Sequence, residues 1–279
     1  MDFSNVKTVI GESDPVVRDG IKSALRDLGF RDVLDLPTLV KVHHSIRRES
    51  VDLIVLNSWM EQEDSSFIVE DIRCGKLGLD PFAIIIMLIG SEDIPRAKAI
   101  AGCGADDAIL LPFAADALTK KIASLAGPRK PFVVTFNYIG PERRAMARND
   151  GHSARQIPVP NPLFSGEGET VYVAHREEAR AQIYAERISR VAFQIVWQAE
   201  QIITLAATEP LVSSTFRPIE DLAKDLTSRP LNPAQSEAVQ QLVSLVRGLK
   251  AVCLHLPQDE LQILLQAAHD VATQFPPLP

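Results

Sequence analysis

Short apolar runs alternate with helical patterns over the first 127 residues of the chain. Two runs, Asp52–Leu56 and Ala83–Ile89, are almost continuously apolar, as strands buried on both faces require. Three further runs predict strands over Val6–Gly11, Asp32–Leu36 and Ala105–Leu110. Between them, apolar side chains recur at helical spacing and predict helices over Val16–Leu28, Leu39–Arg48, Ser66–Cys74, Asp93–Ala101 and Ala114–Ala126. This alternation indicates a parallel sheet with helices on both faces and a functional site at the carboxyl ends of the strands.

The pattern changes after residue 127. Residues 128–174 are rich in proline and glycine and have no sustained periodicity, which predicts a linker with one ordered motif, KPFVVTFNYIGPERR at Lys130–Arg144. From Arg176 to Ala207 a helical pattern continues without glycine or proline, and three shorter helical patterns follow it. The chain is therefore predicted to consist of a domain at 1–127, a linker at 128–174 and an all-α interaction or dimerisation domain, a helical bundle, at 175–279.

The longest helical pattern also bears on the oligomeric state. About 32 residues that rise 1.5 Å each make a helix of roughly 48 Å. This is several times the length of an average globular helix, so we expect it to pair with long neighbours or with another subunit. The sequence thus predicts a homodimer formed through the C-terminal helices.

Composition and charge exclude several classes of protein. The net charge is −7, and residues 1–127 carry most of it, with 14 lysines and arginines against 20 aspartates and glutamates. The C-terminal region is also acidic, so DNA binding is not expected. No apolar run reaches the ~18 residues of a membrane span, and three scattered cysteines fit a cytoplasmic protein. The sequence contains no glycine-rich nucleotide loop, hydrolase motif or metal-ligand spacing, which predicts no cofactor, no metal and no enzymatic activity.

Four stretches of the first domain carry a family resemblance. They read VIGESDPVVRDGIKSAL, VDLIVLNSWM, FAIIIMLIG and GADDAILLPF, in this order. Together they resemble the receiver domain of bacterial two-component response regulators, the CheY-like family, over residues 5–127. The resemblance implies a flavodoxin-like (βα)5 fold for this part of the chain and a role in signal transduction.

The resemblance also implies phosphoryl chemistry, for which this sequence lacks the required groups. Receivers use an aspartate acceptor after the third strand, an acidic pair that holds Mg²⁺, a hydroxyl group and a lysine. The acceptor position is Asn57, the acidic pair is Glu12 and Ser13, the hydroxyl position is Ile89 and the lysine position is Leu111. An amide is a poor nucleophile, one metal-binding carboxylate is missing, and a leucine cannot act as a cation beside a phosphate. We therefore expect a degenerate site, a pseudo-receiver, with no catalytic residue.

An alternative keeps phosphorylation open. Glu61, Glu63 and Asp64 lie just beyond the third predicted strand, where one of them could act as a substitute acceptor. Asp52 opens that strand and is expected at the wrong end of the sheet for this role.

A second alternative concerns the linker motif, which resembles a segment that follows the receivers of one bacterial group. Arg144 and Arg148 have the RxxxR spacing of cyclic-di-GMP-binding PilZ domains, and Arg143 lies beside them. The second PilZ motif and the strands of its barrel are not found downstream. We therefore favour a packing role, in which Tyr138 and Pro141 contact the receiver's flank or another subunit and the arginines form salt bridges.

Without phosphorylation, function is expected to lie in surfaces that bind other proteins. Receivers commonly dimerise or bind partners through the fourth helix, fifth strand and fifth helix, and Arg96 and Lys98 lie on the predicted fourth helix. His175, His255 and His269 lack the surroundings of a phosphotransfer histidine. The sequence thus predicts a non-catalytic, phosphorylation-independent adaptor that binds another signalling protein.

Overall fold

The computed structural model describes residues 2–91, 100, 102–143, 155–164, 168–253 and 256–277 of the 279-residue chain. The chain divides into two compact units, Met1–Ala181 and Gln182–Pro279, which we call unit 1 and unit 2. Among the helices that the structure describes, none is long and apolar enough to cross a membrane.

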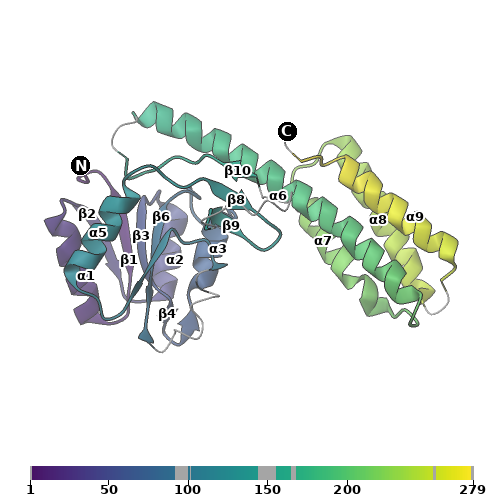
Figure 1. Cartoon of the computed structure of the whole chain (residues 1–279), viewed down its shortest axis with the longest axis horizontal. Coiled ribbons are helices and arrows are strands. Elements are labelled where there is room, and N and C mark those ends of the chain that lie inside the picture. Colours follow the sequence, from purple (N-terminus) through teal and green to yellow (C-terminus); the bar gives the residue numbers. More distant parts are fainter. Residues whose placement is uncertain are drawn as a thin grey trace. The chain divides into compact units, whose positions relative to one another are not determined.

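Unit 1 is built on a five-stranded parallel sheet with the strand order β2-β1-β3-β6-β7 (Figure 1). Its strands are β1 (Lys7–Gly11), β2 (Asp32–Leu36), β3 (Leu53–Asn57), β6 (Ile84–Ile89) and β7 (Asp107–Leu110). The connecting helices are α1 (Pro15–Asp27), α2 (Leu39–Arg48), α3 (Ser66–Arg73) and α5 (Ala115–Leu125). Most of the predicted helix Asp93–Ala101 lies outside the described residues. The predicted flavodoxin-like fold is confirmed.

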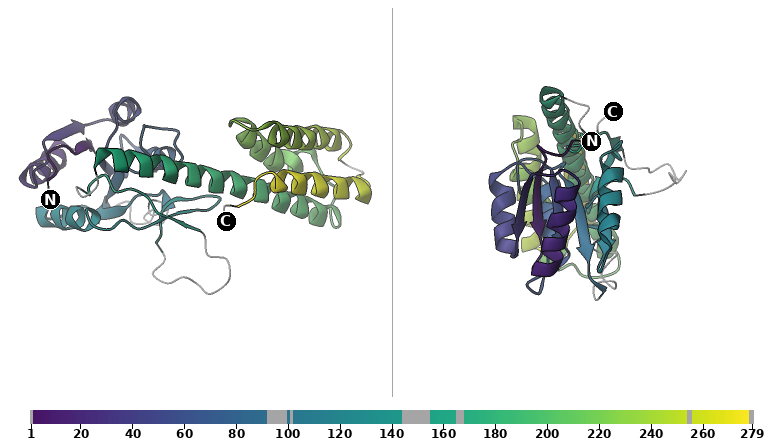
Figure 2. Two further views of the ribbon diagram at one scale, coloured as in Figure 1. Left: turned by 90° about the horizontal axis from the view of Figure 1, so that it is seen from above. Right: turned by 90° about the vertical axis from the view of Figure 1, so that its left-hand side faces the viewer.

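Alternate side chains of the central strands pack on opposite faces of the sheet. Leu53 and Val55 of β3 join the cluster that α1 and α5 cover, whereas Ile54 and Leu56 join the cluster that α2 and α3 cover. Helices therefore lie on both sides of the sheet (Figure 2). Because both faces of β3 and β6 are buried, these strands need apolar residues at every position, which is why their sequences are continuous apolar runs.

A short hairpin that the sequence did not predict follows β3. It pairs β4 (Trp59–Met60) with β5 (Glu63–Asp64) through Glu61 and Gln62. These two residues have φ angles of 52° and 67°, as a two-residue type I′ turn requires. Such turns favour asparagine and glycine, so Glu61-Gln62 provided no sequence signal for the hairpin.

The segment after α5 differs from the predicted linker. Its described residues, 128–143 and 155–164, which we call the strap, contain β8 (Phe132–Val134), β9 (Ile139–Pro141) and β10 (Gln156–Ile157). These strands form an antiparallel sheet in the order β10-β8-β9. Phe132, Val134 and Ile157 are fully buried. The predicted boundary at 127 is therefore replaced by one at 181, because strands of two or three residues are too short to produce a periodic pattern.

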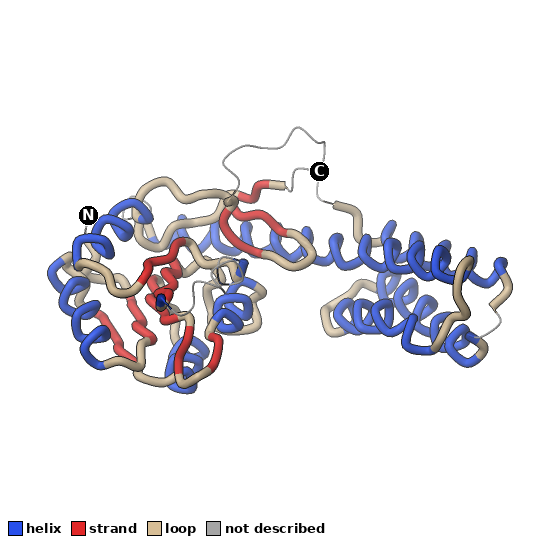
Figure 3. Tube along the Cα trace, turned by 60° about the horizontal axis from the view of Figure 1, so that its bottom comes forward, coloured by secondary structure: helices blue, strands red, loops and turns tan. Residues whose placement is uncertain are grey.

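The remaining helices form unit 2 together with the second part of α6 (Glu169–Ala206), which begins seven residues before the predicted start. A 3₁₀ turn, η2 (Ser213–Phe216), precedes α7 (Arg217–Thr227), α8 (Pro233–Ala251) and α9 (Gln258–Thr273). All described elements of unit 2 are helical (Figure 3). Their apolar faces share one core, which includes Ile195, Ala199, Leu226, Leu242 and Leu264. The all-α character predicted for the C-terminal region is confirmed.

Candidate functional site

The positions that correspond to a receiver's phosphoryl site meet at the carboxyl edge of the sheet. Glu12 follows β1, Asn57 ends β3, Ile89 ends β6 and Leu111 follows β7. Because β1, β3, β6 and β7 are consecutive parallel neighbours, their carboxyl ends lie side by side. The fold therefore brings together the residues that the resemblance to receiver domains assigned to the phosphoryl site.

A hydrogen bond between Asn57 and Glu12 lies at the centre of this edge. Nδ2 of Asn57 donates to Oε2 of Glu12 over 2.8 Å, and the other carboxylate oxygen of Glu12 accepts from the backbone N–H of Asp14 over 2.9 Å. Oδ1 of Asn57 accepts from the backbone N–H of Trp59 over 3.0 Å. Glu12 is 2% exposed. Each side-chain oxygen of the pair thus has a hydrogen-bond donor supplied by this chain.

The other three positions hold one hydroxyl group, which has a hydrogen-bond partner in this chain, and two apolar side chains. The Ser13 hydroxyl donates to the carbonyl of Pro37 over 3.1 Å. Ile89 is buried in the core beneath α2 and α3, and Leu111 packs against the core beneath α1 and α5. No group of three or more histidine, cysteine or acidic side chains is arranged to hold a metal ion within the described part of the chain.

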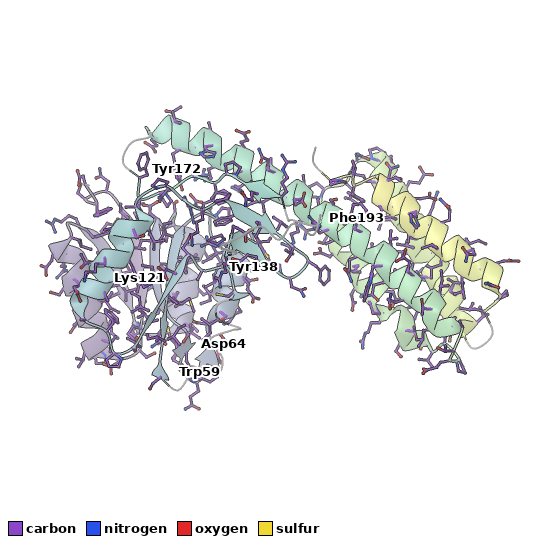
Figure 4. The ribbon with its side chains drawn as sticks, in the orientation of Figure 1. Trp59, Asp64, Lys121, Tyr138, Tyr172 and Phe193 are labelled. Atoms are coloured by element: carbon purple, nitrogen blue, oxygen red, sulfur yellow. The ribbon has the colours of Figure 1, made fainter. Side chains whose placement is uncertain are left out.

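The acidic residues proposed as substitute acceptors lie on the β4–β5 hairpin, near the labelled Trp59 and Asp64 (Figure 4). Oε2 of Glu61 accepts from the backbone N–H of Leu39, at the start of α2, over 2.9 Å. Oδ1 of Asp64 accepts from the backbone N–H of Ser66, at the start of α3, over 2.8 Å. Glu63 is exposed. Carboxylates at helix N-termini satisfy unpaired backbone donors and interact favourably with the helix dipole, so Glu61 and Asp64 have structural roles.

At the opposite, amino edge of the sheet, a buried ionic cluster attaches the strap. Arg73 pairs with Asp106 at 2.7 Å, and Arg129 of the strap pairs with the other oxygen of the same carboxylate at 2.9 Å. The Phe132 ring lies 5.1 Å from the Arg73 guanidinium and 5.0 Å from that of Arg129. We call these four residues the amino-edge cluster; the side chains of its three charged members are at most 5% exposed.

The YIGPERR motif packs on the same flank of the receiver. The Tyr138 hydroxyl donates to the carbonyl of Pro141 over 2.8 Å, and Nη2 of Arg143 donates to the carbonyl of Ala105 over 3.0 Å. Nε of Arg143 also donates to the Tyr138 hydroxyl over 3.0 Å, and burial raises the pKa of that phenol.

Two glycines allow this close packing. A Cβ at Gly140 would lie 2.8 Å from Cα of Gly104, and a Cβ at Gly104 would lie 2.5 Å from the carbonyl oxygen of Ile139. Gly104 also has a φ of 101°. The geometry matches the packing on the receiver's flank that we favoured for the motif, although Arg143 binds a carbonyl and a phenol in place of a carboxylate.

The first turns of α6 are anchored to the loop before β6. The Tyr172 hydroxyl, labelled in Figure 4, donates to Oδ2 of Asp80 over 2.7 Å. Arg176 approaches the same carboxylate at 3.8 Å. Burial and the neighbouring carboxylate raise the pKa of Tyr172. Sequence analysis missed this contact, because neither residue belongs to a motif.

Several candidate residues lie outside the described residues, namely Arg96, Lys98, Arg144, Arg148 and His255. The cyclic-di-GMP hypothesis depended on two of these arginines, and Arg143, the third, makes the contacts given above. The ring of His269 contacts the carbonyl of Leu265 at 2.9 Å.

Comparisons with known proteins place the first part of the chain in a family. Residues 9–123 match the model of the response regulator receiver domain. A search of curated proteins found no matching sequence.

Solved structures that resemble the chain are also receivers. One is the receiver domain of a sensor histidine kinase from Pseudomonas aeruginosa, 22% identical, which aligns over 42% of this chain and 93% of its own with a TM-score of 0.37. Another is a response regulator from Thermotoga maritima, 24% identical, which aligns over 43% of this chain and 96% of its own with a TM-score of 0.37. The chemotaxis response regulator CheY4 of Vibrio cholerae is 20% identical and aligns over 43% of this chain and 97% of its own with a TM-score of 0.37. The family match, together with the strand order, shows that unit 1 contains a receiver domain, which indicates response-regulator-like signalling.

Proposed function

We propose that this chain is a non-catalytic, phosphorylation-independent adaptor of the response-regulator type. The observation that carries the proposal is the hydrogen bond between Asn57 and Glu12. It joins the acceptor position to the remaining metal-ligand position, so the two groups that would act on Mg²⁺ and phosphate bind each other.

Each step of phosphoryl transfer lacks a group at this edge. Asn57 offers an amide in place of a nucleophilic carboxylate. A hard cation would find only one carboxylate, that of Glu12, among Glu12, Ser13 and Asn57. Leu111 has no charge with which to stabilise a phosphoryl oxygen. Glu61 and Asp64, on the hairpin that follows β3, are bound to the starts of helices.

The test is incubation of the full chain with a small phosphodonor and Mg²⁺, followed by measurement of the intact mass. We expect no gain of a phosphoryl group, while a competent receiver treated in parallel gains one. A gain that disappears in Glu61→Gln or Asp64→Asn would overturn the proposal, because a substitute acceptor would then exist. The matched variant Asn57→Asp with Leu111→Lys shows whether restoring the aspartate and the lysine is enough for the chain to be phosphorylated.

As a second part of the proposal, the adaptor is a homodimer through its C-terminal helices. The length of α6 is not sufficient support, because residues 169–181 belong to unit 1 and only 182–206 belong to unit 2. Better support comes from Phe193 and Trp197, which lie one turn apart on α6 and are each 49% exposed. Large aromatic side chains are common at protein interfaces.

Light scattering of the full chain tests this part. We expect twice the chain mass for the natural sequence and a monomer for Phe193→Ser with Trp197→Ser. Val212→Ser, at an apolar residue of similar exposure, serves as the control. A monomer for the natural sequence at high concentration would contradict the dimer.

We place this adaptor in the cytoplasm and expect another signalling protein, and no DNA, as its partner. Cys74, Cys103 and Cys253 form no disulfide bond, which fits a reducing compartment.

A further inference from the structure

A groove runs between α7 and α8 on the surface of unit 2. It encloses about 500 Å³ over a floor that includes Ile219, Ala223, Val243 and Val246, of which only Val243 is half-buried and the other three are at most 1% exposed. Its rims are polar, with Lys224 and Thr227 on α7 and Ser244 and Arg247 on α8. A second hollow of about 370 Å³ shares Glu220 and Lys224 with the first and extends it to Arg217, Asp221 and Lys250. We call the combined depression the α7–α8 groove.

The charges of unit 2 are unevenly distributed, and the groove holds the unpaired cations. Arg217, Lys224 and Arg247 have no ion-pair partner among the residues that the structure describes, and all three are exposed.

The other cations of the unit are engaged. Lys250 binds Glu220 at 2.9 Å, Arg229 binds Asp225 at 3.0 Å and Arg190 binds Glu186 at 2.8 Å. Arg187 also has an interaction partner.

Four cations and two carboxylates therefore line the groove, in a unit whose overall charge is negative. An excess of unpaired positive charge along an apolar floor attracts a partner with the opposite charge and an apolar stripe.

From these observations we infer that the α7–α8 groove binds an acidic amphipathic helix of a partner protein. Between Arg217 and Thr227, α7 rises about 15 Å at 1.5 Å per residue, which matches about three turns of a docked helix. Such a helix would place apolar side chains at the i, i+3 or i+4 and i+7 positions over Val243 and the aliphatic stems of Lys224 and Arg247. Its carboxylates would pair with Lys224 and Arg247 on opposite rims and with Arg217 at one end.

This inference rests on the proposed adaptor role and states the chemistry of the partner. The elongated floor and the two-sided charged rim favour a helix over a compact small molecule. Exposed ion pairs contribute little individually, so the apolar contact would come from Val243 and from the aliphatic stems of Lys224 and Arg247, and the cations supply preference for an acidic partner.

The test is a selection of displayed peptides against the full chain. The library consists of peptides of about 14 residues, roughly four turns, with leucine and alanine on one helical face. The other positions are randomised among glutamate, lysine, glutamine and serine. We expect the enriched sequences to carry more glutamate than lysine, and a synthetic copy of the most enriched one to bind with an affinity that falls as salt is added.

A pair of charge-matched variants locates the site. Lys224→Gln with Arg247→Gln removes two positive charges from the groove and is expected to weaken binding of the enriched peptide about tenfold. The control, Gln201→Glu with Gln262→Glu, makes the same change in net charge at exposed positions of α6 and α9 outside the groove. It is expected to leave the affinity within about twofold, since surface charges away from the groove are screened.

Three results would overturn the inference: no enrichment, enrichment of neutral or lysine-rich sequences, or equal binding to the groove variant and the natural chain. Binding of an anionic detergent such as decyl phosphate in the groove, without peptide enrichment, would instead identify a small-molecule site. The selection uses no phosphodonor, so its failure would leave the proposal on phosphorylation unaffected. Conversely, a phosphorylated chain that still selects acidic peptides would refute only the phosphorylation proposal.

Discussion

Removing the negative charge of the amino-edge cluster should destabilise unit 1. Asp106 neutralises both Arg73 and Arg129, through contacts of 2.7 and 2.9 Å, and all three side chains are nearly inaccessible to water. Asp106→Asn keeps the shape of the side chain and leaves two buried cations without a counter-ion. Breaking a buried ion pair by removing one partner costs about 3–5 kcal/mol. Arg73 retains three backbone carbonyls as acceptors, those of Gly104, Pro81 and Ala83. We therefore expect the lower end of this range, about 3 kcal/mol.

Urea unfolding followed by tryptophan fluorescence measures this loss. The chain has two tryptophans, Trp59 in unit 1 and Trp197 in unit 2, so the comparison is made in a Trp197→Phe background in which Trp59 alone reports. With a urea dependence of about 1–3 kcal/mol per molar, a loss of about 3 kcal/mol should lower the midpoint by about 1–3 M. The control is Asp116→Asn, which removes an exposed ion pair to Lys120 and should leave the midpoint unchanged. A fall no larger than that of the control would refute the idea that Asp106 holds the strap on the receiver.

Three other predictions concern single residues of unit 1. Gly140→Ala should lower the free energy of unfolding by about 1–3 kcal/mol, because the new Cβ would lie 2.8 Å from Cα of Gly104. Gly102→Ala, which has open space around its Cβ, should leave the stability unchanged. Equal urea midpoints for the two variants would contradict the close packing at Gly140. The thermal midpoint of Asn57→Asp should rise when Mg²⁺ is added, because this variant has a second carboxylate beside Glu12. The thermal midpoint of the natural sequence should not respond to Mg²⁺, and a response would count against the degenerate site. Burial raises the pKa of Asp52. The Asp52 carboxyl therefore destabilises the folded state increasingly as the pH rises above about 4, the ordinary pKa of an aspartate. Removing that charge by Asp52→Asn should raise the thermal midpoint at neutral pH, by a difference that shrinks in acid, and a constant difference across pH would reject this cause.

Features that depend on local pattern were predictable from the sequence. The continuous apolar runs at β3 and β6 specified strands covered on both faces, and Asp14 and Pro15 marked the start of α1. The positions of Asn57 and Glu12 followed from the strand ends, because parallel strands place their carboxyl ends at one edge.

Features that depend on contacts distant in sequence could not be predicted in this way. The strap has strands of two or three residues, and its order depends on Arg129 reaching Asp106 across 23 positions. The contact between Tyr172 and Asp80 spans 92 positions, and neither residue has a distinctive local pattern. The hydrogen bond from Asn57 to Glu12 joins two groups 45 positions apart, and only the fold shows that they meet.

The amino-edge cluster has a consequence for how the protein is made. The family match ends at residue 123, yet Asp106 and Arg73 remain without Arg129 and Phe132 until the chain extends past that point. Domains generally fold as units during synthesis, in order from the N-terminus. A nascent chain released at the family boundary would hold a buried carboxylate with one cation in place of two and an uncovered Phe82. The buried cluster of the receiver is thus completed by residues that come after the receiver in the chain, and the smallest stable fragment should end near residue 181.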